Sequence, residues 1–273
     1  MKQKITDTLL QVATWLAAAL TFGALFFLIA YILARGIPHI RPSLFALHYN
    51  TQNVSLLPAL ITTVLTVLLS LAVAVPLGLF TAIYLVEYAK RGNCLVALVR
   101  MTAETLSGIP SIVYGLFGML FFVTWLGWGF SILAGTFTLA IMILPLILRT
   151  AEESLKAVPD TYREGAFGLG AGRLRTVFRI VLPAAAPGIL AGVILAVGRI
   201  VGETAALIYT AGTVAQIPES LMASGRTLSV HMYALSSEGL YTGQAYATAV
   251  VLLVLVAGIN TLSAALAKKI GKG

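Results

Sequence analysis

Residues 152–183 read EESLKAVPDTYREGAFGLGAGRLRTVFRIVLP, and they belong to the longest hydrophilic stretch of the chain, 149–183. Pro159 followed by Asp160 is a pattern typical of a helix start. Glycines and a basic amphipathic segment follow, so the stretch predicts a short helix, a glycine turn and a second short helix, Arg173 to Ile180. A solvated loop with a helix on the membrane surface is the alternative, because basic amphipathic segments commonly lie on anionic headgroups.

Outside this stretch the chain is strongly apolar. Of its 273 residues, 59% are hydrophobic and 10% are charged, whereas soluble domains carry about 25% charged residues. This composition excludes a soluble globular enzyme. Because one span needs ~20 apolar residues, the length accommodates roughly six spans. We therefore expect an all-α polytopic membrane protein with six transmembrane helices in a single domain, 1–273.

The apolar runs give the approximate bounds of these spans. The third run contains a Gly-Ile-Pro break, which predicts an interfacial helix, a bend and then a span. An N-terminal span precedes a core of about 56–267, and the six runs cover about 12–33, 56–86, 95–125, 130–148, 184–211 and 244–267.

The basic residues predict the orientation of the chain. Six spans place both termini on one side, and that side carries fourteen Lys and Arg residues against three on the other. Cytoplasmic loops are rich in Lys and Arg, so both termini and 149–183 are expected to be cytoplasmic. This bias also explains the net charge of +8 without nucleic-acid binding. The fourteen are Lys2, Lys4, Lys90, Arg91, Arg100, Arg149, Lys156, Arg163, Arg173, Arg175, Arg179, Lys268, Lys269 and Lys272.

Several chemistries have no sequence signature here. The chain has no G-x-x-x-x-G-K-[ST] phosphate loop and no H-E-x-x-H motif. Its three histidines, His39, His48 and His231, fall in predicted outer loops and are expected to be solvated rather than ligands. We therefore expect no cofactor on this chain, and its function must come from the spans and the 149–183 loop.

One motif in this loop resembles a known family. Glu164, Gly165, Ala166, Gly170, Ile180, Leu182 and Pro183 match the EAA motif of ABC importer permeases, E-A-A-x3-G-x9-I-x-L-P, at six of seven fixed positions. The departure is Gly165, which costs the helix up to ~1 kcal/mol relative to alanine. The resemblance implies that the short helix docks on a separate ATPase subunit, and that ATP and Mg bind to that partner.

Two further segments narrow the resemblance. SGIPSIVYGLFG at 107–118 and GRIVGETAA at 198–206 are similar to segments of the phosphate importer permeases PstA and PstC, and the chain is most like PstA. This implies a type I ABC importer fold in an inner or plasma membrane and translocation of inorganic phosphate. The implied partners are a PstC-like permease in a heterodimer, two PstB-like ATPases and a periplasmic or extracellular PstS-like phosphate-binding protein.

Arg199 and Glu203 are the candidate substrate residues, because charges inside a span are costly and usually functional. Their four-residue spacing places them on one face of a continuous helix. The arginine fork suits phosphate oxygens, and the carboxylate can accept the proton of hydrogen phosphate, which sulfate lacks. The alternative is a structural ion pair. Thr204 and the break at Ser107, Gly108 and Ser111 complete the predicted path, since helix N-termini bind anions; a simple interfacial kink is the alternative for that break.

Two predictions concern packing. Gly188, Gly192 and Ala196, and separately Gly198, Gly202 and Ala206, are small residues four apart, a spacing that lets helices approach closely. Glu104 lies four residues after Arg100 and is expected to pair with it.

Other functions stay open from the residues alone. The chain could import another oxyanion or small solute, because the loop motif identifies the class of transporter and not its substrate. A proton-coupled secondary transporter would use Arg199 and Glu203 as a proton relay. A non-transporting assembly subunit is the third alternative.

Overall fold

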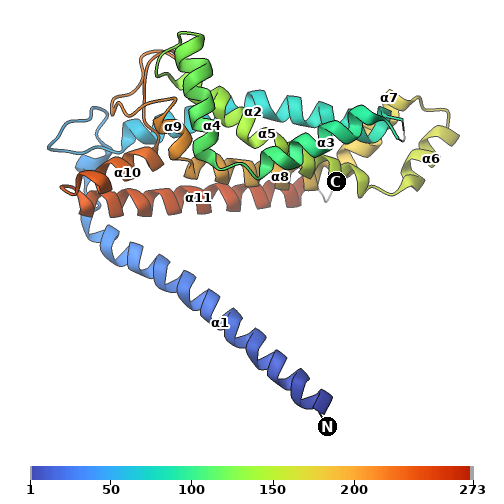
Figure 1. Cartoon of the computed structure of the whole chain (residues 1–273), viewed down its shortest axis with the longest axis horizontal. Helices are drawn as coiled ribbons and strands as arrows, with labels where there is room; N and C mark the ends of the chain where they lie inside the picture. Colours follow the sequence, from blue (N-terminus) through green and yellow to red (C-terminus); the bar gives the residue numbers. More distant parts are fainter. Residues whose placement is uncertain (1, 91, 271–273) are drawn as a thin grey trace.

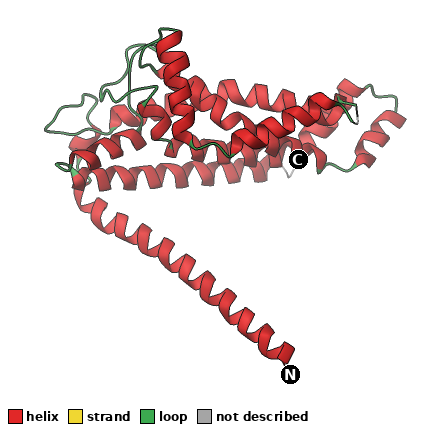
Figure 2. Cartoon of the chain, viewed as in Figure 1, coloured by secondary structure: helices red, strands yellow, loops and turns green. Residues whose placement is uncertain are grey.

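The computed structural model describes residues 2–90 and 92–270, so Arg91 and Lys272 of the basic set lie outside the described residues. Every regular element in the described part of the chain is helical (Figure 2). Five helical stretches are long and apolar enough to cross a membrane, and a bent pair makes a sixth. This confirms the expected all-α architecture with up to six spans. The five stretches are Asp7–His39, Leu57–Tyr88, Ile132–Lys156, Arg173–Gly202 and Thr242–Leu262.

A bundle of long helices forms the body of the protein (Figure 1). Helix α5 (Ile132–Lys156) is central and packs against α2 (Leu57–Ile83) and α8 (Leu182–Gly202), and α11 (Thr242–Ile270) covers α8. Fully buried aliphatic side chains fill the space between them, and they include Ile132, Leu139, Ile143, Ile147 and Ile200.

Glycines of α8 allow its close contact with α5. A Cβ at Gly188 or Gly192 would collide with the side chain of Ser154 or Thr150. The packing prediction is confirmed for this stripe. In the second set, Ala206 is buried and closely approached by Gly115, whereas a Cβ at Gly198 or Gly202 would meet no described residue, so close packing at these two glycines stays a prediction.

The bent pair is the third predicted segment. Helix α3 (Cys94–Ser107) meets α4 (Ser111–Gly118), which continues as the π-helical η4 (Met119–Trp125), at an angle of 103°. The break between two helices that the sequence predicts is therefore confirmed, whereas the interfacial position of the first helix stays a prediction. Tyr114 supports the bend, since its hydroxyl donates to the Leu106 carbonyl across it at 2.7 Å.

The fifth span differs from its predicted bounds. Helix α7 (Arg173–Thr176) and the π-helical η5 (Val177–Val181) run into α8 as one rod, so no separate surface helix exists at 173–180. The buried Val177 and Val181 hold this segment against the protein. The rod ends at Gly202 rather than 211, Glu203 is extended, and the short α9 (Ala205–Ile208) follows.

The two ends of the bundle differ in character. We call the end that carries α6 (Asp160–Gly168) the coupling end, and the opposite end the loop end. The loop end gathers 37–56 with its short η1 (Ile37–His39) and η2 (Pro42–Phe45), the segment 209–227, and α10 (Leu228–Glu238) (Figure 2). Helix α1 (Lys2–Gly36) leaves the bundle at this end and projects away from it, with most of its side chains exposed (Figure 1).

Candidate functional site

The predicted motif helix is α6, and it protrudes from the coupling end. Glu164 and Gly165 are exposed, whereas Ala166 is buried against the protein. Gly170 has a φ of +78°, in the left-handed region that glycine adopts without steric cost. The turn after the helix therefore requires glycine at this position. Tyr162 and Phe167 of the helix are also exposed, and Leu169 directly after it is 92% exposed.

Arg163 fastens α6 to the membrane helices. Its Nη2 lies 2.8 Å from Oε1 of Glu87, in η3 (Tyr84–Tyr88) at the end of α2. The same guanidinium donates to the carbonyls of Leu155 and Val158, at 2.9 and 2.8 Å. The two charged side chains are only 14% and 7% exposed. Sequence reasoning missed Glu87, because a contact 76 residues away in the chain has no local signal.

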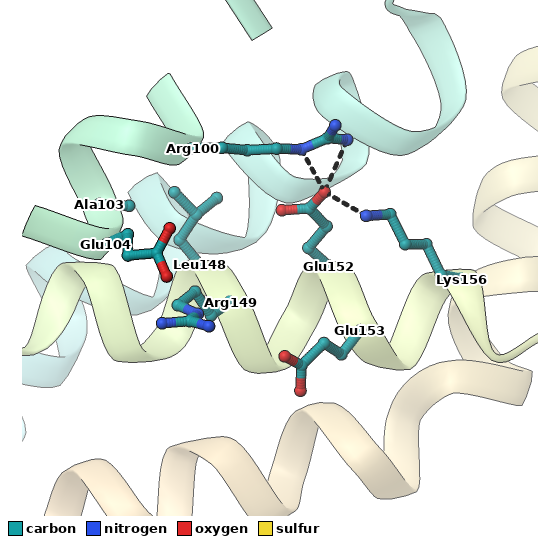
Figure 3. A pocket seen from close by; sticks show the side chains of 8 residues that line it. All are labelled: Arg100, Ala103, Glu104, Leu148, Arg149, Glu152, Glu153 and Lys156. Carbon is teal, nitrogen blue, oxygen red and sulfur yellow. Dashed lines mark hydrogen bonds and ion pairs between the residues drawn. The ribbon is translucent and has the colours of Figure 1, made fainter. Parts of the chain in front are cut away.

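A second ion cluster joins α3 to α5 at the same end (Figure 3). The buried carboxylate of Glu152 accepts from Arg100 and from Lys156, each at 2.7 Å. The predicted pairing of Arg100 with Glu104 is therefore wrong. Glu104 is exposed, whereas a buried carboxylate needs a partner, so Glu152 takes the arginine. Glu104 instead lines a cavity of about 200 Å³ together with Arg149.

The structure separates Arg199 and Glu203. Arg199 lies in the last turn of α8, but Glu203 follows the helix end, so the prediction of one continuous helix face is wrong. None of the four ion pairs in the described part of the chain joins them. Glu203 is 9% exposed. Its Oε1 accepts from the Ala206 N–H at 3.1 Å and so satisfies a free donor in the first turn of α9.

The two predicted path segments lie in neighbouring elements. Helix α4 packs on α9, and a Cβ at Gly115 would lie 2.8 Å from the Cα of Ala206. The break at Ser107, Gly108 and Ser111 precedes α4, and Thr204 precedes α9. The helices that follow these two breaks, almost 100 residues apart in the chain, therefore pack against each other. Their contact with substrate stays a prediction.

The histidines behave differently from one another. His39 and His48 are exposed, as expected. His231 is only 1% exposed and lies in α10, so the prediction of a solvated loop residue is wrong for it. The first turn of α10 packs into the core through Leu228 and Val230, which carries the histidine inside.

Comparison with known proteins identifies one family and several related permease proteins. Residues 74–272 match the family described as binding-protein-dependent transport system inner membrane component. The probable ABC transporter permease protein YqgI of Bacillus subtilis is 32% identical over 260 residues, which cover 88% of this chain and 86% of that protein. The phosphate transport system permease protein PstA 2 of Mycobacterium bovis is 34% identical over 77% of this chain and 69% of that protein. PstA of Mycobacterium leprae is 37% identical over 70% of this chain and 64% of its own length.

Solved structures share the fold at low identity. A chain of a bacterial alginate ABC transporter superposes with a TM-score of 0.69 at 15% identity, covering 94% of this chain and 96% of that chain. A chain of the MetNI methionine ABC transporter, in an inward-facing conformation, superposes with a TM-score of 0.60 at 20% identity. The match covers 78% of this chain and 93% of that chain. These likenesses support the permease architecture.

Proposed function

The chain belongs to the family of binding-protein-dependent transport system inner membrane components, and from this premise we propose that it is the PstA-type permease subunit of an ABC phosphate importer. The observation that carries the proposal is the coupling end: a protruding helix with the EAA spacing, an exposed glutamate and exposed apolar side chains. We infer that the substrate is phosphate from the relatives that are named phosphate transport system permease proteins. We treat 1–273 as one permease domain.

The chain is the non-catalytic, membrane-spanning part of the importer in this proposal. A PstB-like ATPase dimer binds ATP and Mg and receives α6, and Tyr162, Phe167 and the following Leu169 supply apolar contact. When the ATPases close, α6 moves as a lever. Arg163 passes that movement to α2 through Glu87, and to α5 through the carbonyl of Leu155 in its last turn and that of Val158 just after it.

Phosphate crosses between this chain and a homologous PstC-like permease. Arg199 at the end of α8 offers a planar fork to the anion, and Glu203 accepts the proton of hydrogen phosphate. The open surface at Gly198 and Gly202, where no described residue would meet a Cβ, leaves room for the partner beside Arg199. A PstS-like binding protein delivers phosphate at the loop end.

We propose that the coupling end faces the cytoplasm, with both termini and 149–183 on that side. The fourteen-to-three distribution of Lys and Arg supports this orientation. In Figure 1, α1 begins and α11 ends toward the coupling end, which agrees with a shared side for both.

Uptake by the reconstituted complex tests the function. The complete importer in vesicles should accumulate phosphate only when ATP reaches the ATPases, and it should reject sulfate. Uptake that follows an imposed proton gradient without ATPase subunits would instead indicate a secondary transporter. Faster uptake of sulfate than of phosphate would indicate another cargo, and flux that survives deletion of this chain would indicate an assembly subunit.

A further inference from the structure

Arg226 is a buried cation that forms no ion pair with any described residue. It lies at the loop end, directly before α10, and is 6% exposed. Its Nε and Nη2 are buried and have no hydrogen-bond partner among the described residues, and none of the described ion pairs includes it. Because an unpaired buried charge is strongly unfavourable, this guanidinium requires an anion.

The two free nitrogens form a ready-made fork. Nε and Nη2 lie on the same edge of the planar guanidinium, and their parallel N–H groups match two oxygens of one oxyanion. One face of the group is already occupied, because Arg226 lies 4.8 Å from the centroid of the Tyr49 ring. Tyr49 covers this face, and the unpartnered Nε and Nη2 edge is the side on which a bidentate ligand would bind.

His231 adds a donor to the same place. It lies in α10, and neither ring nitrogen has a partner in the described part of the chain. Its ring stands edge-on to Tyr49, with centroids 6.1 Å apart, so both side chains flank one aromatic ring. Burial and the Arg226 charge lower the pKa of His231 to about 3. The neutral ring therefore offers one N–H to an anion.

Tyr49 closes this site from the loop 46–55. The backbone N–H of Tyr49 donates to Oε1 of Gln216 at 3.3 Å, and Nε2 of Gln216 donates to the Tyr49 carbonyl at 2.9 Å. Tyr49 is half-buried, whereas Gln216 is exposed. Two hydrogen bonds at the surface thus hold the ring over two buried, unpartnered side chains.

We propose that Arg226 and His231 form an internal binding site for a small tetrahedral oxyanion, covered by Tyr49 and separate from the predicted path at Arg199. The choice of phosphate as its ligand rests on the proposed function. The anion comes either from solution or from a phospholipid headgroup, and both sources present the same oxygens to the fork.

Equilibrium binding of radiolabelled inorganic phosphate to the purified, nucleotide-free complex tests this site. All variants are made in a parent that carries Arg199→Leu, so that phosphate bound at the predicted path is not counted. Arg226→Gln should then lose one bound phosphate per chain, or weaken it by about tenfold or more, as loss of a charged hydrogen-bonding partner implies. Arg41→Gln is the matched control, because Arg41 is an exposed arginine of the same end, and it should bind as its parent does.

Two additional sets of measurements cover a variant that fails to assemble and a phospholipid source of the anion. If Arg226→Gln does not assemble, Arg226→Lys keeps the charge but loses the fork, and His231→Phe removes the second donor; both should weaken phosphate. Phosphorus analysis of the purified complex detects a retained phospholipid, and its loss in these variants would support the site with lipid as source. Equal phosphate and phospholipid contents in parent and variants would overturn the proposal. ATP-driven uptake, measured on the same samples without Arg199→Leu, tests the proposed function separately.

Discussion

Gly165 occupies the position at which the EAA motif carries its first alanine. A Cβ there would meet no described residue, and the residue lies inside α6. Gly165→Ala should therefore stabilise the helix by up to ~1 kcal/mol and leave phosphate uptake per assembled complex intact. Gly170→Ala is the matched comparison, since a left-handed residue costs ~1–2 kcal/mol without glycine, and it should reduce uptake. Equal uptake by the two variants would contradict the role of this turn.

Variants of Glu203 can distinguish a role in capping α9 from a contact with the substrate. Glu203→Gln keeps an oxygen that can accept from the Ala206 N–H, whereas Glu203→Leu removes it. We expect Gln to preserve assembly and to weaken the discrimination against sulfate more than phosphate uptake, because an amide can donate to an oxygen that the carboxylate repels. Competition of sulfate with phosphate uptake measures this. Leu should also lose ~0.5–2 kcal/mol of stability with the cap. If Gln left the phosphate-to-sulfate ratio unchanged, Glu203 would be a cap alone.

His231 makes stability depend on pH. Its folded pKa is about 3, against an unfolded value of ~6.5, so between these values the unfolded chain binds a proton that the folded chain does not. The contribution is complete above pH 6.5 and is lost as the pH falls, by about 1.4 kcal/mol per unit. Thermal unfolding of the complex between pH 7 and 5 should therefore shift more for the parent than for His231→Gln. Parallel curves would contradict a neutral buried histidine.

At the scale of elements, local patterns predict some features and long-range contacts decide others. The bend between α3 and α4 follows from Gly108 and Pro110, because glycine and proline together favour a break in a helix. The end of α8 at Gly202 was missed, because apolar residues continue on both sides of Glu203 and only the capping of α9 reveals the break. The partner of Arg100 was also missed, since burial of Glu152 depends on the tertiary packing of α3 against α5.

The Arg163–Glu87 pair should carry motion between α6 and the bundle. Removing one partner of a buried pair costs ~3–5 kcal/mol, and removing both relieves the stranded charge. We therefore expect Glu87→Leu to lose uptake, and the Glu87→Leu, Arg163→Leu double variant to assemble but hydrolyse ATP without matching phosphate transport. The ratio of phosphate imported to ATP hydrolysed measures coupling. Asp160→Asn is the control, because that partner of Arg163 is 86% exposed and contributes little. A double variant with normal coupling would leave the pair as structural only.

At the scale of the whole molecule, α1 shows what one chain does not specify. Its apolar length predicts a span, and the structure confirms a membrane-compatible helix. Its direction away from the bundle has no sequence signal, because all its faces are apolar and Trp15 and Phe26 stay exposed. Only the C-terminal part of α1 is fixed, where Gly36 fits closely against the backbone of Tyr246 in α11. Lipid or the partner permease covers the remaining surface in the proposed importer.

The orientation of the molecule can be read from its one cysteine. Cys94 is exposed at the start of α3, near the coupling end, and the sequence contains no other cysteine. If that end is cytoplasmic, a membrane-impermeant maleimide should label Cys94 only after cells are permeabilised. A Gln52→Cys, Cys94→Ala variant places the thiol at an exposed position of the loop end, and it should react in intact cells. Labelling of Cys94 in intact cells would show that the coupling end faces outward, and α6 could then not meet ATPases in the cytoplasm.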